Sequence, residues 1–150
     1  MLNLKQELFK KCIQYANERI KSAEDAITAA KEASQDDTKS SAGDKYETTR
    51  EMMQQEISRN EAGLFEAKKL KHALSQISVD KVYKTIQPGS IAFTNNGNFF
   101  IAVSAGQFEL EGKAFFAISQ GSPIGKQLSG LKKNGKFTFN GREFKISDIT

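Results

Sequence analysis

Residues 34–47, SQDDTKSSAGDKYE, separate two long stretches in which apolar residues recur with a helical period. The segment is polar, and its Ser, Asp and Gly residues favour turns and would interrupt a continuous helix. Helical patterns of similar length precede and follow it. We therefore predict that residues 34–47 are the exposed tip of a helical hairpin.

The stretch before the tip carries a regular apolar stripe at alternating spacings of four and three residues. Its members are Phe9, Ile13, Ala16, Ile20, Ala23, Ile27 and Ala30. This rhythm is the 3.5-residue period of a coiled-coil seam. No Gly or Pro falls between residues 4 and 33, so the intrinsic helix propensity agrees with the pattern.

A second helix is predicted from about residue 45 to residue 76, with a matching but less apolar series. That series is Arg50, Met53, Ile57, Asn60, Leu64, Ala67 and Lys71. Antiparallel pairing sets Ile27 against Met53 and Ala23 against Ile57, with the fold-back centred on Ser40. A parallel dimer of two chains is the alternative. The turn-forming tip and the equal helix lengths favour a hairpin within one chain, and we expect a monomer.

From residue 78 the pattern changes to short stretches rich in β-branched and aromatic residues. Candidate strands are residues 82–86, 90–94, 99–104, 113–119, 137–139 and 143–149. Asn140-Gly141 is the commonest signal for a two-residue hairpin turn. Most of the 11 Phe residues lie in this half. We expect them to form the core of a small antiparallel sheet.

The segment 122–130, SPIGKQLSG, has the signals of one short helix. Ser122 suits the N-cap, Pro123 the first helical position and Gly130 the residue after the last turn. Ile124 and Leu128 lie four residues apart and would share one apolar face. The sequence thus predicts an α+β fold, with a coiled-coil hairpin in residues 1–77 and a β-rich domain in residues 78–150.

Charge and cysteine content exclude several classes of protein. Residues 1–80 hold 13 Lys and Arg against 14 Asp and Glu, whereas residues 81–150 hold 9 against 4, so the second half is basic. The single Cys12 permits no internal disulfide, and with His72 alone it does not make a structural zinc site. Because no orienting acid is evident, we expect Cys12 to be a small buried hydrophobe rather than a nucleophile. No apolar run is long enough for a membrane span and no signal peptide is evident, so we expect a cytoplasmic protein without membrane contact.

The order of the elements and the segment SPIGKQLSG resemble the bacterial Gre-type transcription elongation factors, the GreA/GreB family. That family carries a Ser-Pro-x-Gly-(Lys/Arg)-x-Leu-x-Gly segment, which is matched here from Ser122 to Gly130 and follows Ala117-Ile118-Ser119. The resemblance implies an FKBP-like C-terminal domain that docks at the secondary channel of RNA polymerase. The hairpin would then reach towards the active site and contact nascent RNA only indirectly.

The same resemblance points to residues that bind the polymerase. Four lie in the matched segment, namely Ser122, Pro123, Gly125 and Lys126. Lys132 and Lys133, with Lys136, form a basic cluster beside them. The cluster is either a solvated face or the part that meets an acidic polymerase surface.

The tip departs from the family pattern Gly-Asp-Leu-Ser-Glu-Asn-Ala-Glu-Tyr. When the family Tyr is aligned with Tyr46, the two acidic positions used in transcript cleavage fall on Lys39 and Ala42, which do not bind a metal ion. The remaining acidic candidates at the tip are Asp36, Asp37 and Asp44. Either Asp36 and Asp37 share a Mg²⁺ ion with the polymerase, or these residues are solvated and Asp44 caps the second helix.

The chain is therefore not expected to be an enzyme or to hold a cofactor of its own. We expect it to modulate elongation or pausing by occupying the channel, while stimulation of transcript cleavage stays open. Two alternatives remain. An FKBP-like fold suggests a peptidyl-prolyl isomerase, although fold alone is weak support for function. A coiled-coil scaffold without a link to polymerase is the other.

Overall fold

A computed structural model describes residues 2–37 and 43–150, and side chains are described for residues 3–35 and 47–150. The chain is α+β. Two long helices, α1 (Leu2–Asp37) and α2 (Gly43–Ser75), precede a six-stranded mixed sheet that carries one short helix, α3 (Pro123–Leu128). This coarse architecture confirms the α+β prediction.

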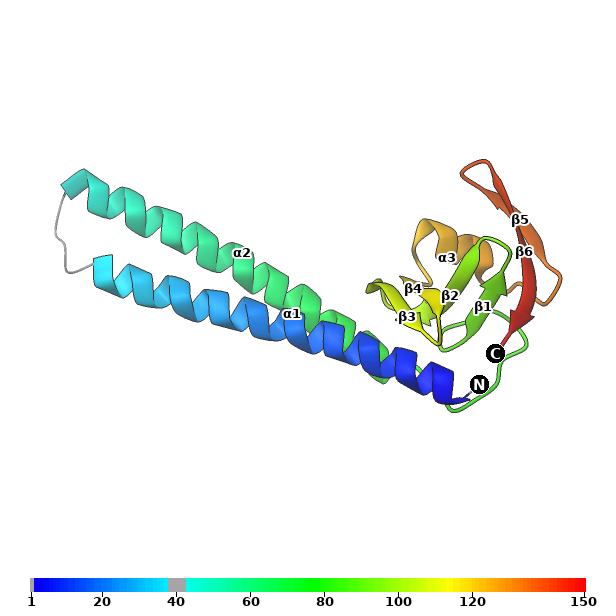
Figure 1. Ribbon diagram of the computed structural model, residues 1–150. Coiled ribbons are helices and arrows are strands. Elements are labelled where there is room, and N and C mark those ends of the chain that lie inside the picture. The colour runs from blue at the N-terminus through cyan, green and yellow to red at the C-terminus, as the bar shows by residue number, and fades with distance from the viewer. Residues whose placement is uncertain (1, 38–42) are drawn as a thin grey trace. The chain divides into compact units, whose positions relative to one another are not determined.

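The chain forms two compact units (Figure 1). Unit 1 contains Met1–Tyr15 and His72–Thr150, and unit 2 contains Ala16–Lys71. Unit 1 therefore holds the ends of both long helices together with the sheet. The boundary predicted after residue 77 marks the change from helix to strand. The two units are defined instead by which residues contact each other, so unit 1 also includes residues 1–15 and 72–77.

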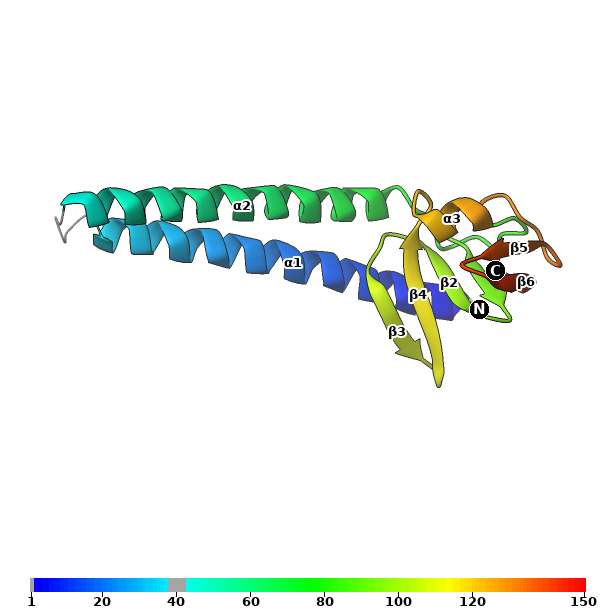
Figure 2. The ribbon, with the colours of Figure 1, turned by 90° about the horizontal axis from the view of Figure 1, so that it is seen from above.

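In unit 2 the two helices lie side by side and run antiparallel (Figures 1 and 2). Four members of the predicted stripes are buried, and most of the others are half-buried. Ala16, Ala30, Ile57 and Ala67 are buried there. Arg50 and Lys71, the two ends of the predicted second series, are exposed.

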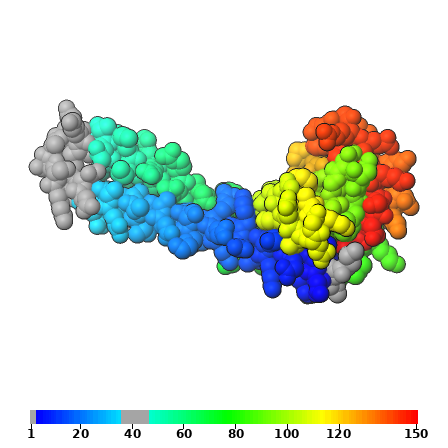
Figure 3. All heavy atoms as spheres, viewed as in Figure 1, coloured from blue at the N-terminus to red at the C-terminus, as the bar shows by residue number. Residues whose placement is uncertain are grey.

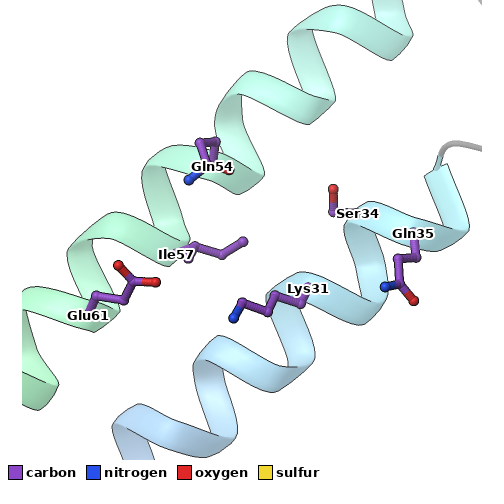
Figure 4. A pocket seen from close by; sticks show the side chains of 6 residues that line it. All are labelled: Lys31, Ser34, Gln35, Gln54, Ile57 and Glu61. Atoms are coloured by element: carbon purple, nitrogen blue, oxygen red, sulfur yellow. The ribbon is translucent and has the colours of Figure 1, made fainter.

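A pocket between α1 and α2 shows how the helices are aligned (Figure 4). Its volume is about 310 Å³, and Ile57 points from α2 towards α1 beside Lys31 and Ser34. The predicted partner of Ile57 was Ala23, whereas the α1 residues that line this pocket with Ile57 are Lys31, Ser34 and Gln35. A seam with a seven-residue repeat is equivalent after a shift of one heptad, so the pattern alone does not select the register.

The sheet has the strand order β3-β4-β2-β1-β6-β5. The strands are β1 (Ile91–Thr94), β2 (Gly97–Ala102), β3 (Gly106–Leu110), β4 (Lys113–Ser119), β5 (Lys136–Phe139) and β6 (Arg142–Ile149). The prediction of an antiparallel sheet is wrong for one pair, because β2 and β4 are parallel. The chain leaves β2 through the edge strand β3 and returns antiparallel to it, which brings β4 alongside β2 in the same direction.

Two further differences concern individual strands. The sequence pattern missed β3, whose Gln107 and Glu109 are exposed at the sheet edge. The expected strand 82–86 is absent from the described residues, apart from a single bridge between Thr85 and Lys132. There, Tyr83 packs on the core and donates a 2.8 Å hydrogen bond to the carbonyl of Ser78.

One face of the sheet packs under α3 and forms the main core of unit 1. Its buried residues are Ile86, Ala92, Phe99, Ile101, Leu128, Phe144, Ile146 and Ile149. A row of aromatic rings crosses this face. Phe116 stacks on Phe99 with centroids 5.7 Å apart, Phe99 lies 6.2 Å from Phe144, and Phe144 stacks on Phe137 at 4.8 Å. Most Phe residues of the sheet domain are buried or half-buried, as expected, whereas Phe116 is 36% exposed.

Lys5 links α1 to the segment that leads into the sheet. Its side chain is fully buried and donates a hydrogen bond to the carbonyl of Lys81. The ammonium group also lies 4.8 Å from the ring centroid of Tyr83, a cation–π contact. Burial lowers the pKa of Lys5, and the charge of Asp80 opposes that shift. This buried charge is therefore held by a carbonyl, a ring and a nearby carboxylate.

Candidate functional site

The acidic residues predicted for the tip fall outside the described side chains. The backbone of α1 ends at Asp37 and that of α2 begins at Gly43, one residue before Asp44. The side chains of Asp36, Asp37 and Asp44, as well as Lys39 and Ala42, lie outside the described part of the chain. The interpretation of the tip thus rests on the sequence alone.

Ser122 caps α3 as predicted. Its backbone is extended, with φ −67° and ψ 159°, and its hydroxyl accepts a 3.1 Å hydrogen bond from the N–H of Gly125. The same hydroxyl donates to the carbonyl of Ser119 at 2.7 Å. Pro123 follows at the first helical position, where no N–H is needed. Ser122 is therefore held in two hydrogen bonds that form the turn into α3.

Gly125 stands where the chain approaches itself too closely for a side chain. A Cβ atom there would overlap the carbonyl oxygen of Ser119 and lie 2.8 Å from the hydroxyl oxygen of Ser122. Leu128 is fully buried in the core. Gly130, with φ 82°, has the left-handed conformation that ends α3.

Lys126 is the one specified position of the Ser-Pro-x-Gly-(Lys/Arg)-x-Leu-x-Gly pattern that carries a charge. Its side chain is exposed on α3, as are those of Lys132 and Lys133 in the following loop. The predicted partner-binding residues hence divide into two groups. Ser122 and Gly125 shape the turn, with Pro123 at its exposed end, whereas the three lysines are charged side chains exposed to solvent.

The lysines belong to a stretch without acidic residues. Between Glu111 and Glu143 the chain has no Asp or Glu, and its basic residues there are Lys113, Lys126, Lys132, Lys133, Lys136 and Arg142. On the face shown in Figure 3, the orange and red atoms that follow α3 lie at the surface of unit 1. The segment from Lys126 to Arg142 therefore carries five basic residues and no acidic one, and positive charge of this kind attracts acidic surfaces.

The sequence singled out Lys136 as part of the basic cluster, but its pairing with Lys145 was not predicted. Lys136 and Lys145 are direct partners in the β5–β6 ladder. The signal was present, because a two-residue Asn-Gly turn sets residue 139 opposite residue 142 and so fixes every pair behind it.

Cys12 and His72 do not form a reactive pair of the usual kind. Cys12 is fully buried, and His72 is exposed near the end of α2. Burial raises the pKa of the Cys12 thiol to about 12, so the nucleophilic thiolate is scarce at neutral pH. Cys12 therefore behaves as the small hydrophobe that was expected.

The raised pKa predicts a pH dependence of stability. The unfolded thiol ionises above pH 9, whereas the folded thiol keeps its proton to about pH 12, so ionisation favours the unfolded chain as pH rises through that window. Between pH 8 and 10.5 we expect the free energy of unfolding of the wild type to fall by about 1–2 kcal/mol more than that of Cys12→Ala. Unfolding in guanidinium under reducing conditions measures the free energy of unfolding of both proteins. If it depended on pH in the same way for the wild type and Cys12→Ala, the prediction would be wrong.

Within residues 3–35 and 47–150, no group of three His, Cys, Asp or Glu side chains is arranged to hold a metal ion. No helix in the described part of the chain combines the length and apolar character needed to cross a bilayer.

Comparison with known proteins gave no assignment. No protein family model, no curated protein and no solved structure matches this chain. Function is therefore inferred from the site itself and from the motif between Ser122 and Gly130.

Proposed function

We propose that the protein is an RNA polymerase-binding transcription factor of Gre type. Its C-terminal domain would dock at the secondary channel, and its helices would occupy that channel and modulate elongation or pausing. The observation that carries the proposal is the α3 segment. Its capped turn and tight glycine support α3, while Lys126 is left exposed beside Lys132 and Lys133.

Two finer features of the fold belong to this proposal. The sheet with α3 packed on one face supports an FKBP-like domain, and the long paired helices support an antiparallel coiled coil with its tip near Ser40. In such an arrangement the protein acts as a cytoplasmic monomer and touches nascent RNA only indirectly. Any Mg²⁺ shared with the polymerase would be held through Asp36 and Asp37.

The distribution of charge favours docking through the lysines rather than through the motif as a whole. Substituting Ser122 or Gly125 would disturb α3 and so would confuse folding with binding. Lys126 is exposed and its side chain contributes no contact to the α3 turn. It is therefore the position at which partner binding is tested most cleanly.

We expect Lys126→Glu to weaken capture of bacterial RNA polymerase by the tagged protein by about tenfold or more, because like charges brought together at an interface cost several kcal/mol. Pull-down at low salt, with purified polymerase in a dilution series, measures the effect. Lys113→Glu is the matched control. It makes the same charge change at another exposed lysine of the sheet domain and should leave capture nearly unchanged.

Failure of the wild type to capture polymerase would refute the proposal. Equal losses in Lys126→Glu and Lys113→Glu would show that net charge, and not the α3 surface, governs binding. Transcript cleavage in stalled elongation complexes, with Asp36→Asn/Asp37→Asn beside the wild type, separates cleavage from occupancy. Loss of cleavage in that variant would assign the chemistry to these two acids.

A further inference from the structure

The register of the last hairpin sets two like charges against each other. Lys136 in β5 lies directly opposite Lys145 in β6. Phe137 and Phe144, the neighbouring residues on the two strands, pack into the core. Because successive side chains of a strand point to opposite faces, Lys136 and Lys145 lie on the outer face, and both are exposed.

This arrangement weakens the strand pair that contains it. Side chains directly opposite in an antiparallel ladder have Cβ atoms about 4.5–5.5 Å apart, and like charges at that distance are destabilising. Within residues 3–35 and 47–150 no carboxylate lies within ion-pair distance of either ammonium group. Glu143, the nearest acidic residue along the same face of β6, stands opposite Thr138. The repulsion between the two lysines is therefore not relieved by an ion pair within the described part of the chain.

We infer that the outer face of β5–β6 binds the phosphodiester backbone of a nucleic acid, with a phosphate group seated between Lys136 and Lys145. A phosphate there would convert the repulsion into two attractive contacts. Each ammonium group offers three donors on a flexible stem, which suits phosphate oxygens in varied positions. Glu143 confines the attraction to the end of the hairpin that carries the two lysines.

The composition of the face favours a nucleic acid over a protein. Its outward residues are Lys136, Thr138, Glu143, Lys145 and Ser147, all exposed. Protein interfaces usually have an apolar centre, which this face lacks, whereas nucleic-acid interfaces are polar and positively charged. The face also has no aromatic ring on which a base could stack. It should therefore hold the backbone without reading the sequence.

The test is binding of a fluorescein-labelled oligouridylate to the full chain, followed by anisotropy over a range of salt concentrations. Removing the contacts to one phosphate of a single strand should reduce the slope of log K against log salt by about 0.7 and the affinity at 0.1 M salt by roughly fivefold. We expect this loss in Lys136→Gln/Lys145→Gln. The control variant Lys81→Gln/Lys113→Gln removes the same charge from exposed lysines elsewhere in unit 1. It should keep most of the salt slope and most of the affinity of the wild type.

A second measurement separates binding from folding. Lys136→Gln removes the repulsion, so its unfolding midpoint in urea should rise while its RNA affinity falls. A variant that is more stable but binds less tightly cannot owe its loss of binding to misfolding. A labelled DNA duplex in parallel shows which form of backbone is preferred, and the predicted slope loss on either form supports the inference.

Three outcomes would overturn the inference. The first is no measurable binding of the wild type to either nucleic acid. The second is a salt slope that is equal in the wild type and Lys136→Gln/Lys145→Gln. The third is a poly-glutamate peptide that competes as well as RNA at equal charge, which would identify an acidic protein surface as the partner. None of these depends on whether the protein binds polymerase.

Discussion

Replacing Gly125 by alanine is expected to destabilise unit 1 by about 2–4 kcal/mol, because overpacking costs about 1–3 kcal/mol and loss of the N-cap adds about 1 kcal/mol. The new Cβ would overlap the carbonyl oxygen of Ser119 and press on the hydroxyl of Ser122. That carbonyl and hydroxyl bond each other at 2.7 Å, so the clash falls on the cap itself. Urea unfolding followed by tyrosine fluorescence would measure the loss, since Tyr83 packs on this core.

Gly121→Ala is the matched control. It adds the same methyl group four residues earlier, where no neighbouring atom would lie within 4 Å of the new Cβ and φ is not positive. Its stability should stay within about 0.5 kcal/mol of the wild type. A Gly125→Ala protein as stable as Gly121→Ala would show that the turn relaxes easily and that its glycine is not needed for the fold.

Replacing Phe144 by alanine should cost about 3–5 kcal/mol of the free energy of unfolding, the range for truncating a buried Phe. Phe144 is 5% exposed and stands in the middle of the aromatic row. Its ring stacks on Phe137 at 4.8 Å with an interplanar angle of 5°, and it contacts Phe99 from the other side. Its removal therefore leaves a cavity between β2 and β5 and takes a partner from both rings. Calorimetric unfolding would report the change.

Phe116→Ala removes the same side chain from the end of the row. Phe116 is 36% exposed and touches only Phe99 among the rings of the row. We expect a loss of less than about half that of Phe144→Ala, since partial exposure reduces both the transfer free energy and the cavity. Equal losses would contradict the expectation that the burial of each ring sets the cost of removing it.

Local signals predicted the elements that depend on neighbouring residues. Ser122, Pro123 and Gly130 marked the ends of α3, and Asn140-Gly141 marked the last hairpin, because caps and tight turns are decided within a few residues. Strand β3 was missed because it has only two large apolar residues, Phe108 and Leu110, and owes its conformation to pairing with β4.

Long-range features were less accessible from the sequence. The pairing of Ile57 with Ala23 could not be distinguished from a pairing one heptad on, because the apolar stripe repeats. The stretch 82–86 has strand-like composition, yet it forms only one bridge to another segment. Val82 is 64% exposed while Ile86 is buried, so the main contribution of this stretch is the packing of Ile86 in the core. The parallel pairing of β2 and β4 required knowing that β3 intervenes.

The candidate site divides in the same way. The turn residues of the Ser122–Gly130 segment were predictable because their roles are local, and the lysines beside it were visible as a charge cluster. That Lys136 and Lys145 lie opposite each other follows from the two-residue turn, but only when each residue pair is counted back from Phe139 and Arg142. The tip acids, which the sequence made most prominent, depend on a part of the chain whose side chains are not described.

The position of β6 next to β1 has a consequence for the order in which the protein acquires its structure during synthesis. The first strand of the sheet pairs with the last, and Ile91 and Thr150 exchange backbone hydrogen bonds of 3.2 and 3.0 Å. A ribosome must therefore release residue 150 before β1 gains this neighbour, whereas the contacts within α1 are local and available from the start. Until then the N–H and C=O groups of β1 that pair with β6 lack their partners, and nascent chains stalled before β6 should be the species that chaperones retain.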